Sequence, residues 1–143
     1  MTQSRIKNWL SIGLLSLLPL MALGCGGPSE YAVAGTSRAA GMDGMVTVEK
    51  IEGSFIVRVV LEHLPPPGRL GNGINHYVLW LQPHNQQPHR EAMLEFDEDE
   101  RSGRATATTP QGRFTLIITG ERTAAPASPS DVIVVRKVIA PSN

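Results

Sequence analysis

Short apolar runs with residue-by-residue alternation constrain the fold of this chain more than any other feature. The clearest run places Phe55, Val57, Val59 and Leu61 on one side, with the charged side chain of Arg58 on the other. Period-two alternation with one wetter side is typical of a half-buried antiparallel strand. No stretch after Cys25 keeps a 3.6-residue period, so the sequence predicts an all-β domain.

Turn residues divide the rest of the chain into further strands of similar length. Strands are expected at residues 31–35, 44–51, 55–62, 76–81, 92–96, 104–108, 114–119 and 131–139. Segments rich in Gly and Pro separate them, among them Leu64–Gly73 and Thr123–Ser130. Seven or eight short strands at this spacing predict an antiparallel β-sandwich.

The segment from His76 to Leu81 is apolar on both faces, which is typical of a central strand. Tyr77, Leu79 and Leu81 would share one face, and Val78 and Trp80 the other. We therefore expect Trp80 to be buried. The inward faces of 55–61 and 114–118 should supply the facing residues.

The first residues have the order of a secretory signal. Arg5 and Lys7 precede an apolar run from Trp9 to Leu23, and the run is too short and too interrupted for a span of about 20 apolar residues. Ala22-Leu23-Gly24-Cys25 then resembles the lipobox of bacterial lipoproteins. That resemblance implies cleavage after residue 24 and a diacylglycerol with an N-acyl chain on Cys25, the only cofactor-like group we expect. The alternative is ordinary signal cleavage, which would leave Cys25 as an unpaired thiol.

Three parts follow from this interpretation: a signal peptide at 1–24, a lipidated cysteine with its tether at 25–30, and a β-sandwich domain at 31–143. The chain has 13 Lys and Arg and 13 Asp and Glu, and losing Arg5 and Lys7 leaves a net charge of about −2. The sequence has no cluster of basic residues of the kind that binds nucleic acid, so we expect no nucleic-acid partner.

The expected location is the extracytoplasmic side of the cell envelope. In enteric lipoproteins an Asp directly after the lipidated Cys signals retention at the inner membrane. Gly26 stands at that position here, which favours the outer membrane in a Gram-negative host.

The order of several short motifs resembles the extracytoplasmic C-terminal domain of anti-sigma-K factors and related exported proteins of unknown role. The motifs are Leu64-Pro65-Pro66, Tyr77 to Trp80, an acidic turn with Gly103, Phe114 to Glu121, and a last Val-rich strand, within residues 57–135. The resemblance implies an immunoglobulin-like sandwich outside the membrane. It does not carry over sigma binding, because we expect no counterpart here of the cytoplasmic segment that precedes the membrane helix in that family.

Two histidines provide the candidate metal site. His84 and His89 lie in one Pro-rich loop, and two close imidazoles could bind copper or zinc. Specific sites use three or four ligands, so His63, His76 or a carboxylate would have to complete the set. The competing interpretation, which we favour, is a solvated polar loop with no metal.

The remaining polar motifs favour structure over chemistry. Residues 97–100 are all acidic but lack the spacing of a calcium-binding EF-hand, so we interpret them as a hairpin turn. No Gly-x-Ser-x-Gly elbow is present. The sequence therefore favours a membrane-anchored, non-catalytic module that binds an envelope protein partner or has a structural role. A metal-binding lipoprotein using His84 and His89 is the alternative, and an enzyme is the third hypothesis.

Overall fold

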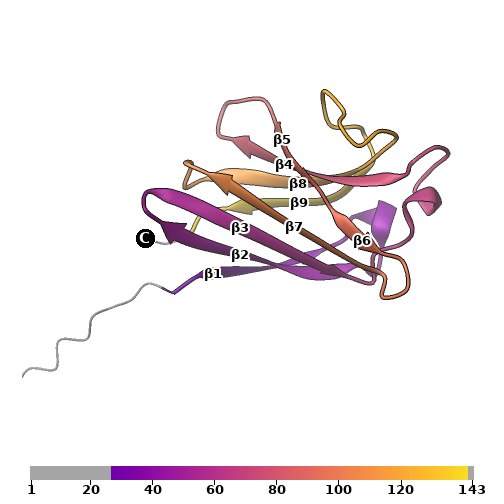
Figure 1. Cartoon of the computed structure of the whole chain (residues 1–143), viewed down its shortest axis with the longest axis horizontal. Coiled ribbons are helices and arrows are strands. Elements are labelled where there is room, and N and C mark those ends of the chain that lie inside the picture. Colours follow the sequence, from indigo (N-terminus) through magenta and orange to yellow (C-terminus); the bar gives the residue numbers. More distant parts are fainter. Residues whose placement is uncertain (1–26, 142–143) are drawn as a thin grey trace, which may run out of the picture.

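Residues 27–141 of the computed structural model form nine strands in two antiparallel sheets (Figure 1). One sheet has five strands in the order β1 (Ser29–Ala34), β2 (Asp43–Ile51), β3 (Ser54–Glu62), β7 (Ser102–Thr109) and β6 (Glu95–Asp97). The other has four, in the order β5 (His89–Met93), β4 (His76–Pro83), β8 (Phe114–Glu121) and β9 (Ile133–Ile139). Two short 3₁₀ turns, η1 (Ser37–Ala39) and η2 (Pro67–Arg69), lie in the connections.

The strand order is that of an immunoglobulin-like sandwich. The row β2-β3-β7-β6 corresponds to strands A, B, E and D of that fold, and the row β5-β4-β8-β9 to C′, C, F and G. β1 adds one strand beside β2. The all-β sandwich expected from the sequence is confirmed. β1 begins at Ser29, two residues before the expected start of the domain.

The prediction of one continuous strand at residues 92–96 is wrong, because this segment is divided between β5 and β6. β5 pairs with β4 in the four-stranded sheet, whereas β6 pairs with β7 in the five-stranded sheet. The chain passes from one sheet to the other at Leu94. The Leu94 N–H donates to the Tyr77 carbonyl of β4 at 2.8 Å, whereas the next residue, Glu95, pairs with Arg104 of β7. An inward-facing residue stays inward when a strand crosses between two packed sheets, so alternation does not reveal the crossing.

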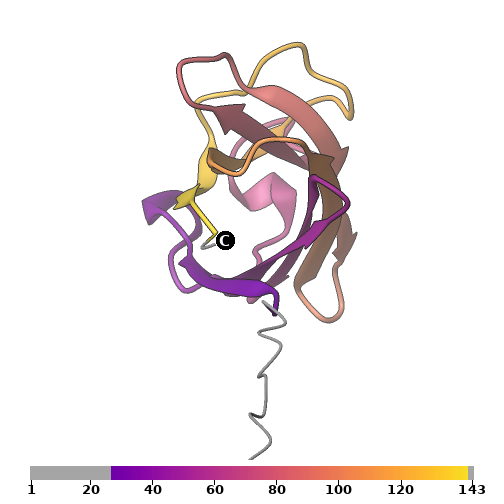
Figure 2. The same ribbon diagram turned by 90° about the vertical axis from the view of Figure 1, so that its left-hand side faces the viewer.

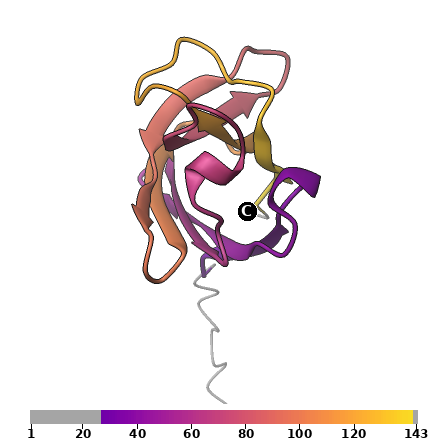
Figure 3. The ribbon, with the colours of Figure 1, turned by 90° about the vertical axis from the view of Figure 1, so that its right-hand side faces the viewer.

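On the other side of the sandwich, Thr36 links the two sheets through hydrogen bonds to β9. Its N–H donates to the Val134 carbonyl at 2.9 Å, and its hydroxyl donates to the Ile133 carbonyl at 2.6 Å. The chain between β1 and β2 is thereby attached to β9. Viewed along the strands, the two sheets form a nearly closed ring (Figures 2 and 3).

The main core lies between the sheets. It contains the inward residues of β3 (Phe55, Val57, Val59, Leu61), β4 (Tyr77, Leu79, Leu81) and β8 (Phe114, Leu116, Ile118). This confirms the inward faces expected for these three strands. A second, smaller cluster of Val78, Trp80 and Ile117 lies on the other face of the four-stranded sheet.

The sandwich has two distinct ends. We call the end where β1 begins the near end. It carries the β2–β3, β4–β5 and β7–β8 turns and the end of β9 (Figure 1). The far end carries η1, η2, the β6–β7 turn and the β8–β9 loop.

Candidate functional site

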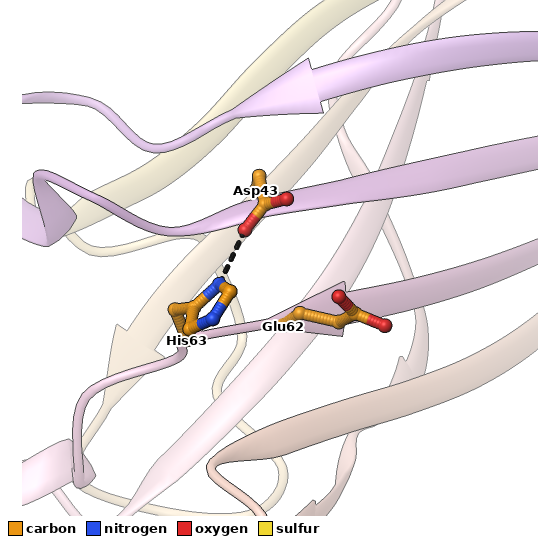
Figure 4. A group of neighbouring side chains, drawn as sticks. All are labelled: Asp43, Glu62 and His63. Carbon is orange, nitrogen blue, oxygen red and sulfur yellow. Dashed lines mark hydrogen bonds and ion pairs between the residues drawn. The ribbon is translucent and has the colours of Figure 1, made fainter.

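Asp43, Glu62 and His63 lie near one another at the far end of the β2–β3 pair, where the His63 imidazole points toward Asp43 and the Glu62 side chain extends away from both (Figure 4). Asp43 is the first residue of β2 and lies directly opposite Glu62, the last residue of β3. His63 follows at once, and its Nδ1 is 2.6 Å from Oδ1 of Asp43. One nitrogen or oxygen ligand atom from each of the three side chains lies within 4.8 Å of the others.

The backbone at His63 turns the imidazole toward Asp43. Its φ of 55° is in the left-handed region, which is uncommon for a residue other than glycine. Arg101 holds this conformation, because its guanidinium donates to the His63 carbonyl at 3.2 Å and its own carbonyl accepts from Leu64 N at 2.8 Å. The β6–β7 turn, which contains Arg101, therefore positions His63.

A shallow hollow of about 250 Å³ lies beside this cluster. Its lining comprises Asp43, Gly44, Met45, Val60 and Glu62. Met45 and Val60 are each 39% exposed, so both carboxylates lie next to an open apolar surface.

The charges of the cluster are only partly balanced by neighbouring side chains. Within residues 27–141 the ion pairs are Arg58 with Glu49 at 2.9 Å and His63 with Asp43. Glu62 belongs to neither, although it faces a second carboxylate across the strand pair. Like charges directly opposite each other in a sheet repel. The three side chains could therefore hold a cation.

This cluster is not predicted from the sequence, where His63 is only a possible third ligand for His84 and His89. A usable signal was present. Once the β2–β3 turn is placed at Glu52-Gly53, antiparallel pairing puts residue 43 opposite residue 62. The missing step was the left-handed turn at His63, which depends on Arg101 in a distant part of the chain.

His84 and His89 lie at the near end instead. His84 follows β4, His89 begins β5, and both side chains are exposed. His84 lines a hollow of about 220 Å³ together with Gln82, Asn85, Arg113, Thr115 and the neighbouring side chains. Burial raises the pKa of the Glu91 carboxyl, and the nearby His89 partly offsets this rise.

No third metal ligand joins His84 and His89 in the part of the chain that the structure describes. The group of three possible ligands found there is Asp43, Glu62 and His63. Of the other two histidines, His63 belongs to that group and His76 lies opposite Glu121 at the far end. Metal binding by His84 and His89 stays a prediction.

The acidic run forms the expected turn. It connects β6 and β7, and the Glu100 N–H donates to Oδ1 of Asp97 at 2.9 Å. That bond joins a side chain to the backbone three residues on, and such local side chain–backbone bonds favour turns.

A second polar cluster holds the β8–β9 loop against the four-stranded sheet. Glu121 is only 5% exposed, and its Oε1 accepts from the Thr119 hydroxyl at 2.5 Å and from Ser130 N at 2.8 Å. The Trp80 indole N–H donates to the same Thr119 hydroxyl at 2.8 Å. Glu121 also lines a hollow of about 300 Å³ with Ile74, Arg122 and the residues 130–132 that precede β9. Because each of these bonds ties the loop or Trp80 in place, the cluster has a clear structural role.

Cys25 lies outside the described residues. Within residues 27–141 no helix is long and apolar enough to cross a membrane. We compared the chain with protein-family profiles, curated protein sequences and solved structures, and none of them matches it.

Proposed function

We propose that this protein is a lipid-anchored component of the bacterial cell envelope whose β-sandwich is a non-catalytic binding module. The observation that carries the proposal is the position of Cys25, the single cysteine, after a signal-like segment and four residues before β1. A short tether of small residues, Gly26-Gly27-Pro28, joins the two. A thioether-linked diacylglycerol with an added N-acyl chain would supply stable membrane attachment, because two or more acyl chains are sufficient.

The fold supports a definite orientation on that membrane. Four residues extend at most about 14 Å, so the near end of the sandwich stays close to the lipid surface. The far end, with η1, η2 and the β8–β9 loop, then faces away from it. Loops at one end of an immunoglobulin-like sandwich commonly form its binding surface. We propose that the partner is another envelope protein, which contacts these far-end loops.

The resemblance to the extracytoplasmic domain of anti-sigma-K factors agrees with such a role. It places a sandwich of this kind outside the membrane and carries no catalytic residue over to this chain. The His84 and His89 metal hypothesis is not needed for the proposal.

Replacing the anchor residue tests the proposed function. Cys25→Ser should abolish labelling with a radioactive or alkyne fatty acid and shift the protein from the membrane fraction to the soluble or secreted fraction. The control is Ser29→Ala, which changes a nearby tether-proximal residue and should leave labelling intact. If Cys25→Ser stays membrane-bound after high-salt and carbonate washes, the anchor proposal is wrong.

A further inference from the structure

We propose that Asp43, Glu62 and His63 form a surface binding site for a divalent first-row transition-metal ion, with Zn²⁺ as the representative ion. The site lies at the far end, on the side of the molecule opposite the tether. This inference goes beyond the proposed anchoring and does not depend on it.

The donor set suits such an ion. One imidazole nitrogen and two carboxylate oxygens match the borderline character of Zn²⁺, which binds His and Asp or Glu at about 2.0–2.2 Å. Donors in a tetrahedral arrangement at that distance lie about 3.3–3.6 Å apart from one another. The ligand atoms of the three side chains are within 4.8 Å of one another, and Nδ1 of His63 and Oδ1 of Asp43 are already 2.6 Å apart. The exposed Glu62 side chain extends away from the other two (Figure 4), so it must change its conformation to complete the set.

The backbone fixes the positions of the three ligand residues, although not their exposed side chains, before any ion arrives. Asp43 and Glu62 are a direct cross-strand pair, and β2 and β3 are paired along their whole length. Arg101 fixes the left-handed turn at His63 through its bond to the His63 carbonyl. A site built on paired strands loses little conformational freedom on binding.

Charge provides an independent reason for a cation here. Asp43 pairs with the His63 imidazole, which is charged only when protonated, and Glu62 belongs to no ion pair within residues 27–141. A divalent ion would offset both carboxylates while using the neutral imidazole as a ligand. Three protein ligands would leave at least one coordination position free for water or for a group from a partner.

The same donors argue against calcium and magnesium. Ca²⁺ takes six to eight oxygen ligands, and Mg²⁺ keeps an octahedral shell of oxygens. An imidazole nitrogen as one of three protein ligands suits neither ion, because both prefer oxygen ligands. The Met45 thioether lines the same hollow, but the usual protein ligands of Zn²⁺ are Cys, His, Asp and Glu, so Met45 provides a matched control position.

The test is calorimetric titration of the full chain with Zn²⁺ in detergent, with Cys25→Ser present throughout to remove the single thiol. One Zn²⁺ should bind per chain with micromolar affinity. Removing one ligand by His63→Ala or Glu62→Gln should weaken binding at least about tenfold. Titration with Zn²⁺ should also shift backbone amide NMR signals of residues 42–45 and 61–64 and leave those of the near-end turns unchanged.

Three control variants separate the ligands from their surroundings. Met45→Leu alters the same hollow, Glu52→Gln removes an exposed carboxylate at the near end, and His84→Ala with His89→Ala removes the other histidine pair. All three should retain wild-type affinity. Absence of Zn²⁺ binding below millimolar concentration would overturn the proposal. Binding that survives His63→Ala but is lost in the His84 and His89 double variant would also overturn it. Because no part of this test involves lipid, its failure leaves the anchor proposal untouched.

Discussion

At the scale of single residues, Trp80 is buried without lying between the two sheets. It is 1% exposed and packs with Val78 and Ile117 on the outer face of the four-stranded sheet. In antibody domains the tryptophan of the corresponding strand lies in the main core, where here Tyr77 and Leu79 are found. The β8–β9 loop accounts for this difference, because Glu121 and Arg90 hold it over that face.

We expect Trp80→Ala to lower the free energy of unfolding by about 3–5 kcal/mol, the range for truncating a buried aromatic side chain. Trp80→Phe should cost less, because it keeps most of the apolar contact and loses the bond to the Thr119 hydroxyl. Urea denaturation measures both, with Thr106→Ser as an exposed control that should change little. Equal midpoints for wild type and Trp80→Ala would show that Trp80 does not stabilise the domain.

Tyr77 gives the domain a predictable response to alkaline pH. Burial raises the pKa of its phenol well above 10, and Arg101 offsets part of that rise. The phenol donates to the Pro65 carbonyl at 2.5 Å. The folded state holds this proton more tightly than the unfolded chain. The contribution of the Tyr77 phenol to the free energy of unfolding is therefore complete below about pH 10 and decreases as the pH rises further.

Tyr77→Phe should therefore change stability differently at neutral and at alkaline pH. At pH 7 it should lose about 0.5–1.5 kcal/mol with the hydrogen bond. Between pH 9 and pH 11 its stability should fall less steeply than that of wild type. Urea unfolding at a series of pH values measures both curves, and parallel curves would contradict the assignment.

At the scale of elements, the β2–β3 pair is the scaffold of the proposed metal site, and Gly44 controls its spacing. A Cβ at Gly44 would lie 2.4 Å from the Val60 carbonyl oxygen and 2.7 Å from Cδ2 of Leu61. The first contact is with the backbone of the neighbouring strand, so the strands themselves must separate. Gly44 is also the neighbour of Asp43, and such a shift would move Asp43 away from Glu62.

We expect Gly44→Ala to destabilise the domain by about 1–3 kcal/mol, as overpacking of a close contact does. The matched control is Gly68→Ala in η2, where a new Cβ would have nothing within 4 Å and should change stability by less than about 0.5 kcal/mol. Thermal denaturation followed by circular dichroism compares the two. Similar melting temperatures for both variants would mean that the β2–β3 pair tolerates the added methyl group.

At the scale of the whole molecule, the two ends of the sandwich are far enough apart to test the proposed orientation of the domain relative to the membrane. β3 has nine residues and so spans about 30 Å between the near and far ends. If Cys25 is lipidated as proposed, an introduced cysteine is the only free thiol, because the chain has a single native one. Gln111 lies in the near-end β7–β8 turn and Asp99 in the far-end β6–β7 turn.

We expect a fluorophore on Gln111→Cys to be quenched strongly by a spin-labelled lipid in vesicles that carry the lipidated protein. The same fluorophore on Asp99→Cys should be quenched weakly, because the sandwich separates it from the lipid. Equal or reversed quenching would show that the domain does not stand with its near end toward the membrane.

The period-two pattern by itself determined most of the architecture. Alternation in residues 55–61, 76–81 and 114–119 placed three central strands and their inward faces, because the side-chain period of a strand is a local property. The burial of Trp80 followed from a strand that is apolar on both faces. The turns at residues 97–102 and 110–112 followed from their Gly, Pro and acidic residues.

Only the tertiary structure decided which strands pair and which side chains meet. The division of residues 89–97 between two sheets is not visible locally, because a strand that crosses a sandwich keeps its inward face inward. The metal-ligand group depends on the β2–β3 register and on Arg101, which lies 38 residues from His63 in the chain. Such contacts arise from the packing of distant segments, so no short stretch of sequence contains them.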